Sequence, residues 1–310
     1  MPELPEVTVI TNQLNKKLKG LEIKSIEYDW PKKFHWGEFS IKDLKGAKVS
    51  GVERRGKIVI IRLVSGSVGK WDSRKNQKKP TNQPTYKPTD LSILIHLKLT
   101  GQLIYQDKKT RIAGGHPLPP LNKPVPNSTT RVTITFDRGK LYFNDMRKFG
   151  WVKIIEDKKL EEEDYIKKLG PDPLKMKFDE FRERLKAKRQ GRIKKTLMDQ
   201  SVVGGIGNIY SDEGLWRAKV HPKRSIISLN EAEMKAIYNG VRESFKIAIE
   251  KGGSSANAYV DSGGEKGLYL SFGKAYHMTG KACSRCETPI VREKMDGRSA
   301  HFCPNCQRLK

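Results

Sequence analysis

All four cysteines of this 310-residue chain lie in its last thirty residues, and their spacing restricts how that end of the chain can fold. Cys283 and Cys286 form one C-x2-C pair, and sixteen residues separate it from a second pair, Cys303 and Cys306. Two such pairs, each at a turn, can converge on one tetrahedral ion while the residues between them form a hairpin. We therefore predict a ribbon around one structural zinc ion. Four thiolates leave no open position for catalysis, and two disulfides, the alternative, are disfavoured in a reducing cytosol.

The chain carries a large excess of positive charge. Its 61 Lys and Arg residues against 35 Asp and Glu residues give a formal net charge of +26. Such an excess favours a polyanionic partner, with nucleic acid ahead of an anionic membrane surface. No apolar run approaches the length of a membrane span, and residues 1–10 lack the basic and apolar regions of a signal peptide. We expect a cytoplasmic or nucleoid-associated protein that binds nucleic acid.

The N-terminal half combines one helix with many short strands. Apolar residues recur at helical spacing at Val7, Ile10, Leu14 and Leu18, and Gly20 follows as a stop signal. Alternating or β-branched runs then occupy residues 23–28, 47–52, 57–64, 91–97, 131–136, 140–143 and 151–155. Short strands separated by turns are typical of a β-sandwich or barrel.

The pattern changes from strands to helices at the Gly- and Pro-rich stretch 169–174. We predict an α+β, multidomain chain with four parts: a β-sandwich with a flanking helix over residues 1–155, a helical domain over 170–252, a loop and link over 253–273, and the zinc ribbon over 274–310. Residues 65–90 and 107–130 are predicted to be long surface loops. The lysine-rich part of the first, residues 70–87, adds nonspecific contacts to nucleic acid, binds a partner, or is simply solvated.

The first seven residues, MPELPEV, place a secondary amine beside a carboxylate once Met1 is removed. An α-amino group titrates at about 8, so part of a Pro2 amine is unprotonated at neutral pH and can form an iminium with a sugar aldehyde. Glu3 is placed to give or take protons at the same carbon. The alternative is an inert leader, with Pro5 at the first position of a helix and Glu6 favourable in its first turn.

Residues 194–210, KKTLMDQSVVGGIGNIY, are predicted to form two helices joined by a glycine turn. Glycines let the backbone approach a ligand, and the N–H groups at the start of the second helix suit a phosphate, with Asn208 as a further donor. The spacing is not that of a dinucleotide-binding loop, and no strand precedes it. The alternative is a glycine C-cap between two core helices.

Arg147 and Phe149 lie two residues apart on a predicted turn between strands, within NDMRKFG. Side chains at this spacing project the same way. In a DNA duplex the aromatic ring can act as a wedge, and the arginine can fill the gap or read the orphaned base. The alternative places Phe149 in the core.

These motifs resemble those of the formamidopyrimidine-DNA glycosylase/endonuclease VIII family, and the resemblance extends along essentially the whole chain. The N-terminal heptapeptide, the predicted helix pair, which is similar to the family's helix–two-turn–helix element, and the four-cysteine ribbon carry it. The resemblance implies that Pro2 is the nucleophile, that Glu3 moves protons and that Glu6 supports the site. It also implies that Lys57 bonds a DNA phosphate near the damaged base, and that Arg298, near the hairpin tip, assists a second elimination.

The resemblance further implies DNA contacts. The matching residues are Lys195 and Asn208 for the DNA backbone, Leu99, Arg147 and Phe149 for the intruding wedge, and Arg131 for a family histidine that touches DNA. The sequence departs from the family in two short motifs. In HLKLTG, residues 96–101, Leu99 replaces a methionine that usually follows His-Leu-Gly. In AYHM, residues 275–278, the usual motif is Val-Tyr-Gly-Arg.

The implied activity is removal of 8-oxoguanine and formamidopyrimidines from duplex DNA after base flipping, followed by β- and δ-elimination at the abasic site. The lesion-capping loop of the family corresponds to residues 253–273. The resemblance implies damaged double-stranded DNA as the partner, zinc as the one cofactor, and a monomer. Two alternatives stay open: an endonuclease VIII-like enzyme for oxidised pyrimidines, and a lesion-binding protein without catalysis. A lesion-binding protein without catalysis would have no need for Pro2, Glu3 and Lys57 together, so their presence disfavours that alternative.

Overall fold

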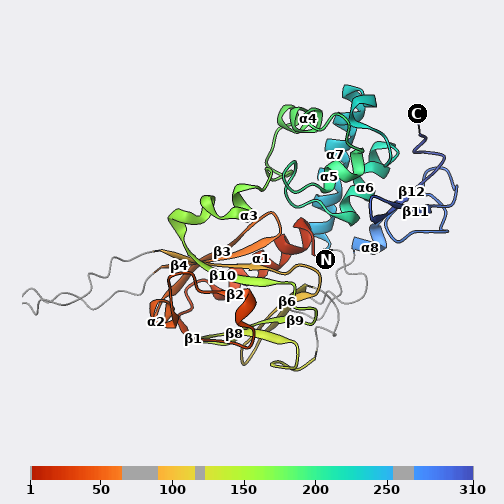
Figure 1. Ribbon diagram of the computed structural model, residues 1–310. Helices are drawn as coiled ribbons and strands as arrows, with labels where there is room; N and C mark the ends of the chain where they lie inside the picture. The colour runs from red at the N-terminus through yellow and green to blue at the C-terminus, as the bar shows by residue number, and fades with distance from the viewer. Residues whose placement is uncertain (1, 65–89, 116–122, 254–268, 310) are drawn as a thin grey trace, which may run out of the picture.

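The computed structural model describes residues 2–64, 90–115, 123–253 and 269–309. It has two lobes, one built from β-sheets and the other from helices and a small ribbon (Figure 1). Helix α1 (Leu4–Leu18) begins where the two lobes meet (Figure 1). The predicted fold class, a β-sandwich with a flanking helix, a helical region and a ribbon with four close cysteines, is confirmed.

Two five-stranded sheets form the sandwich. One consists, in spatial order, of β1 (Ile23–Tyr28), β8 (Thr130–Phe136), β9 (Lys140–Asp145), β6 (Gly101–Gln106) and β7 (Arg111–Gly115). The other consists of β2 (Phe34–His35), β10 (Trp151–Glu156), β5 (Leu91–His96), β4 (Ile58–Val64) and β3 (Lys48–Arg55). Neighbouring strands are antiparallel except β2 and β10.

Strand β4 shows why the second sheet is apolar on both faces. Its Val59 and Ile61 enter the core between the sheets, because alternate residues point to opposite faces. Ile58 and Ile60 point outward and pack with Leu160 in a separate cluster. That outer cluster is covered by the short helices η2 (Asp157–Glu162) and α3 (Asp164–Lys167). Two further short helices, η1 (Pro31–Lys33) and α2 (Ile41–Leu44), lie between β1 and β3 in the sequence.

Strands β2, β6 and β7 were not predicted from the sequence. Strand β7 lies inside residues 107–130, which we predicted as one long loop, so that prediction is wrong for Arg111–Gly115. The strand is only five residues long and ends in two glycines, so its own sequence carries little β signal. Pairing with β6 along its whole length makes it a strand. Residues 116–122 and nearly all of the loop 65–90 lie outside the described residues.

Helix α1 connects the cores of the two lobes. Its predicted apolar residues are all buried in the sandwich core, namely Val7, Ile10, Leu14 and Leu18. Leu4, one turn before Val7, is instead part of the helical core. The helix therefore fixes the start of the chain at the junction of the lobes.

The helical lobe consists of α4 (Phe178–Lys186), α5 (Ile193–Met198), α6 (Asn208–Ala218), η3 (Ile226–Ser228), α7 (Glu231–Glu250) and α8 (Tyr269–Phe272). Helices α6 and α7 approach closely through glycines, since a Cβ on Gly240 would lie 2.7 Å from the carbonyl oxygen of Gly214. In the described part of the chain, no helix combines the length and the apolar character needed to span a bilayer.

The ribbon, with strands β11 (Val291–Met295) and β12 (Arg298–Phe302), packs on α6 through buried charged groups. Asp212 of α6 pairs with Lys194 of α5 at 2.5 Å and accepts hydrogen bonds from the backbone N–H and the ring Nδ1 of His301, both at 3.0 Å. The next residue, Glu213, accepts hydrogen bonds from three consecutive backbone N–H groups of residues 274–276. Adjacent carboxylates on one helix thus fasten the link and the ribbon.

Asp212→Ala leaves the buried ammonium of Lys194 without its carboxylate. Breaking a buried pair from one side costs about 3–5 kcal/mol, so we expect a clearly lower calorimetric unfolding midpoint for the helical lobe and ribbon. Adding Lys194→Met should restore part of the loss, because it removes the uncompensated charge. An unchanged midpoint for Asp212→Ala would show that the pair does not hold the ribbon.

Candidate active site

The carboxylate of Glu3 lies at the N-terminus of α6. It accepts hydrogen bonds from the backbone N–H groups of Gly207 at 2.7 Å and Ile209 at 2.9 Å, and the N–H of Tyr210 lies at 3.4 Å. The free N–H groups and the dipole at the start of a helix favour a negative charge at this place. A Cβ on Gly207 would lie 2.4 Å from the Glu3 Cδ, so only a glycine there leaves room for the carboxylate in this position. The glycine turn therefore binds a carboxylate of the chain itself.

Glu3 and Lys57 are both buried and perturb each other. Burial raises the pKa of Glu3, and the ammonium of Lys57 opposes that rise. Burial lowers the pKa of Lys57, and the carboxylates of Glu3 and Glu6 oppose that fall. The Lys57 Nζ donates a hydrogen bond to the carbonyl oxygen of Ile206 at 3.0 Å. A carboxyl with a raised pKa is suited to donate a proton near neutral pH.

Glu6 orders the backbone around the buried Pro2. Its Oε2 accepts a hydrogen bond from the backbone N–H of Glu3 at 2.7 Å, and its Oε1 accepts one from the hydroxyl of Tyr210 at 2.5 Å. The Tyr210 ring packs edge-on against Phe245, with centroids 5.0 Å apart. Sequence reasoning missed Tyr210, because a tyrosine at the end of an apolar stretch looks like any core residue.

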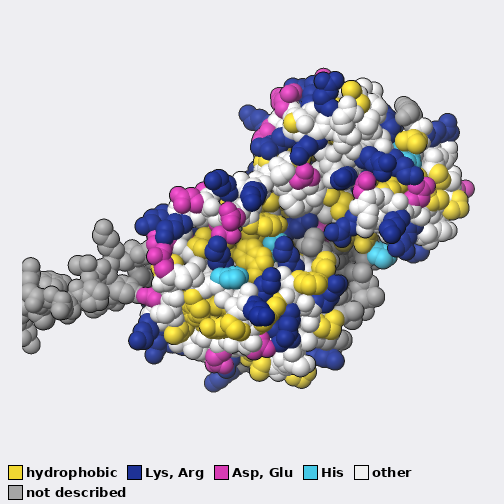
Figure 2. Space-filling view, viewed as in Figure 1, with side chains coloured by type: hydrophobic (Ala, Val, Ile, Leu, Met, Phe, Trp, Pro, Cys, Tyr) yellow, Lys and Arg dark blue, Asp and Glu magenta, His cyan; other side chains and the backbone are white. Residues whose placement is uncertain are grey.

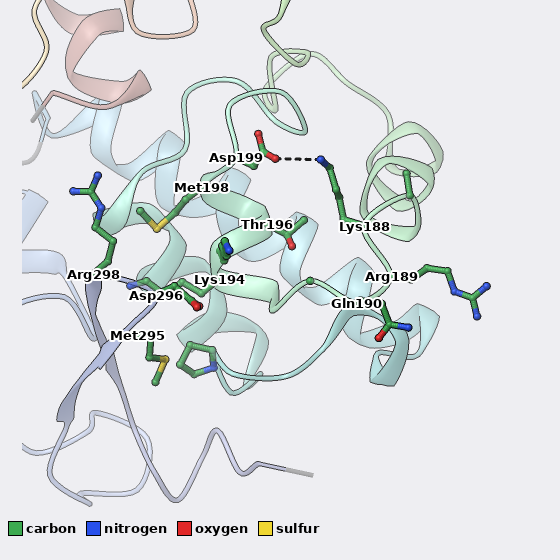
Figure 3. A pocket seen from close by; sticks show the side chains of 14 residues that line it. Lys188, Arg189, Gln190, Lys194, Thr196, Met198, Asp199, Met295, Asp296 and Arg298 are labelled. Carbon is green, nitrogen blue, oxygen red and sulfur yellow. Dashed lines mark ion pairs between the residues drawn. The ribbon is translucent and has the colours of Figure 1, made fainter.

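Arg298 lies beside a cavity of about 760 Å³ between residues 187–199 and the tip of the β11–β12 hairpin. Figure 3 shows Arg298 and Met198 on one side of this cavity and the ion pair of Lys188 and Asp199, at 3.4 Å, on the other. The guanidinium is exposed. The pKa of Lys57 is lowered mainly by burial, and the charge of Arg298 contributes to lowering it.

The two helices of the glycine turn place Lys195 and Asn208 differently. Lys195 is exposed on α5, whereas its neighbour Lys194 is buried against Asp212. Asn208 is half-buried at the first position of α6, and its side-chain oxygen has no hydrogen-bond partner among the described residues. Lys195 is therefore exposed, whereas the side-chain oxygen of Asn208 is enclosed at the N-terminus of α6.

The predicted wedge residues lie on two turns that the structure brings together. Phe149 is 46% exposed, so the alternative of a core position is excluded, and the Arg147 guanidinium lies 4.8 Å from the centre of its ring. Leu99 is half-buried on the turn between β5 and β6. The buried Asp145 connects the two turns, because it bonds the hydroxyl of Thr100 and the backbone N–H groups of residues 147 and 150.

Arg131 was expected to contact DNA, but the structure places its side chain inside the protein. It is only 8% exposed, and its guanidinium is committed to partners within the chain. It bonds the carboxylate of Asp29 at 2.6 Å and the carbonyl oxygens of Ser128 and Asp145 at 2.9 and 3.0 Å. The arginine therefore supports the loop before β8 and the turn after β9 instead of presenting its charge on the surface.

The four cysteines converge as the spacing predicted. Their sulfur atoms all lie within 4.8 Å of one another, Cys283 and Cys303 buried and Cys286 and Cys306 half-buried. A closed set of four thiolates is the donor set of a structural zinc site.

Figure 2 shows Lys and Arg side chains spread over both lobes of the visible face, with fewer Asp and Glu side chains among them. This distribution agrees with the net charge of +26 and suits a polyanion that contacts both lobes. Residues 254–268, most of the predicted lesion-capping loop, lie outside the described residues.

Three family profiles match this chain in order. They are the formamidopyrimidine-DNA glycosylase N-terminal domain over residues 1–152, the formamidopyrimidine-DNA glycosylase H2TH domain over 169–260, and the zinc finger found in FPG and IleRS over 280–309. Curated proteins named formamidopyrimidine-DNA glycosylase are similar along their whole length. The protein of Pelotomaculum thermopropionicum is 33% identical, covering 100% of both chains, and that of Streptococcus pneumoniae strain R6 is 35% identical, covering 99% of both.

Solved structures of DNA complexes are also similar. A complex between wild-type Lactococcus lactis Fpg (MutM) and N7-benzyl-Fapy-dG-containing DNA aligns with a TM-score of 0.79 at 32% identity, over 99% of this chain and 100% of that one. A complex of MutM with carbocyclic 8-oxo-G-containing DNA aligns with a TM-score of 0.78 at 32% identity, with the same coverage.

Gly207→Ala tests whether the position of the Glu3 carboxylate matters for catalysis. The added Cβ displaces the carboxylate from the N–H groups of α6, so we expect base excision to slow by about a hundredfold or more while the protein stays folded. The measurement is single-turnover excision on a lesion duplex. Gly51→Ala is the control, since its Cβ would meet only an ordinary contact, at 3.6 Å. A wild-type rate for Gly207→Ala would mean that the position of this carboxylate does not matter.

The ribbon holds one structural zinc ion. Prolonged treatment with a chelator should release one zinc per chain and reduce DNA cleavage, because the hairpin that carries Arg298 loses its support. Metal released is counted with a colorimetric indicator, and re-addition of zinc should restore cleavage. Full activity after complete zinc removal, or a stoichiometry other than one, would contradict this role.

Proposed function

Since this chain belongs to the formamidopyrimidine-DNA glycosylase family, whose members are base-excision repair enzymes, we propose that it removes 8-oxoguanine and formamidopyrimidines from duplex DNA and then cleaves the resulting abasic site. The names of its relatives and the DNA in the similar complexes support this substrate class. The observation that carries the chemistry is the buried group of Pro2, Glu3, Glu6 and Lys57 at the start of the chain.

Removal of Met1 frees the secondary amine of Pro2. Its lone pair attacks C1′ of the damaged nucleotide, and the base leaves with the electrons of the glycosidic bond. Glu3 protonates the ring oxygen, so the sugar opens and the C1′–N bond becomes an iminium. Glu6 holds the backbone N–H of Glu3 and keeps the amine and the carboxyl in place. Burial raises the pKa of Glu3, which favours the proton transfer that this step requires.

The iminium acidifies C2′. Loss of a C2′ proton expels the 3′ phosphate by β-elimination, and a second loss of a proton expels the 5′ phosphate by δ-elimination. Water then releases the sugar fragment and regenerates the amine. Arg298 binds the phosphate at the lesion and assists the second elimination.

A base inside a duplex hides C1′, so the enzyme must first extrude the nucleotide, which costs a few kcal/mol of stacking and pairing. Leu99, Arg147 and Phe149 enter the duplex and occupy the vacated space. Lys57, Lys195 and Asn208 hold the DNA backbone, and their contacts offset the unstacking. One chain supplies all these groups, so we expect a monomer that works on the chromosome in the cytoplasm.

Borohydride trapping tests the proposal. The protein is incubated with a duplex that carries one 8-oxoguanine opposite cytosine, and borohydride reduces any iminium to a stable adduct. We expect the adduct on the N-terminal peptide by mass spectrometry. Pro2→Gly should trap far less, and a protein with one extra residue before Pro2 should bind the duplex without trapping.

An adduct on a lysine side chain would overturn the role of Pro2. Trapping only on a duplex with an oxidised pyrimidine would place the enzyme with endonuclease VIII. Tight lesion binding without any adduct, despite a free Pro2 amine, would leave a protein that binds lesions without catalysis.

A further inference from the structure

The turn between β5 and β6 holds a residue that its backbone conformation disfavours. Lys98 has a φ of 50°, in the left-handed region where glycine is usual, and the family motif has glycine at this place. The turn is well bonded around it: the backbone N–H of Lys98 donates to Nδ1 of His96 at 3.0 Å, and that of Gly101 donates to the carbonyl oxygen of Leu97 at 2.9 Å. A strained residue held by its surroundings is often a sign of function.

An aromatic cluster fixes the turn. Because Nδ1 of His96 accepts a hydrogen bond, its Nε2 carries the ring proton and donates to the hydroxyl of Tyr165 at 3.2 Å. Burial lowers the pKa of His96 to about 3, so the ring stays neutral. The rings of His96 and Tyr165 meet edge to face at 5.1 Å, and Trp151 packs against both.

The ammonium of Lys98 lies over this cluster, and it forms no ion pair with the described residues. Its Nζ is 5.5 Å from the centre of the Tyr165 ring, and no carboxylate in the described parts of the chain lies within ion-pair distance. Burial and the charge of Lys33 lower the pKa of Lys98. Lys98 in turn contributes to lowering the pKa of Lys57, which places it within electrostatic reach of the active site.

We propose that Lys98 binds a DNA backbone phosphate beside the extruded nucleotide, a contact that the usual glycine cannot make. Three observations converge on this. The ammonium is half-buried near other cations and has no anionic partner among the described residues. Its residue adjoins the wedge residue Leu99, and a lysine occupies this position although its backbone conformation favours glycine. The inference rests on the proposed function, because it requires that the chain binds lesion-containing DNA.

The test is the salt dependence of binding to a duplex that carries a tetrahydrofuran abasic-site analogue. The analogue cannot form an iminium, so the measurement reports binding alone. Lys98→Met removes the charge and keeps the strained backbone, whereas Lys98→Gly removes both. Both variants should weaken binding about three- to tenfold at moderate salt and reduce the slope of log K against log [KCl] by about 0.9. Lys98→Gly alone should also raise the thermal midpoint, because glycine relieves the strain.

Lys219→Met is the matched control. Lys219 also has a positive φ, 56°, but it lies exposed at the far end of α6 from Glu3, so its variant should keep the wild-type slope. A wild-type slope for Lys98→Met, or an equal loss of slope for Lys219→Met, overturns the inference. If the wild-type protein does not prefer the lesion duplex over undamaged DNA, the proposed function is contradicted. The Lys98 contact, which depends on that function, is then contradicted as well.

Discussion

Backbone N–H groups at the start of α6 hold the carboxylate of Glu3, and the arrangement of the active site depends on this contact. Leu4 strengthens it, because its backbone N–H donates to the carbonyl oxygen of Gly205 at 3.1 Å and its side chain packs in the helical core. About two hundred residues separate the partners along the chain. The Pro2 amine is therefore positioned only when both lobes are folded and docked.

Helix α6 also fixes the position of the ribbon relative to Glu3. Its first turn binds Glu3, and its next residues, Asp212 and Glu213, fasten the ribbon and its link. An α-helix rises only 1.5 Å per residue and is stiff over this length. Arg298 thus stands at a defined distance from Glu3, although the two residues lie near opposite ends of the sequence.

Local patterns predicted α1, most strands and the cysteine cluster, because each depends on side chains close in sequence. The grouping of Pro2, Glu3, Glu6 and Lys57 was expected from the family resemblance, and the structure brings them together. Tyr210, Asp212 and the internal role of Arg131 could not be predicted, since their meaning comes from partners far along the chain. Both motifs that depart from the family do so at a usual glycine, and Lys98 and His277 keep positive φ values of 50° and 59°.

The burial of Pro2 between the lobes has a practical consequence for anyone producing the protein. An affinity tag or fusion partner at the N-terminus would acylate the amine that we propose as the nucleophile, and it would have to extend from a buried residue. Leu309, at the other end, is 61% exposed. Tags, fluorophores and surface tethers therefore belong at the C-terminus. If Pro2 is the nucleophile, as we propose, an N-terminally tagged preparation would bind DNA without showing catalysis.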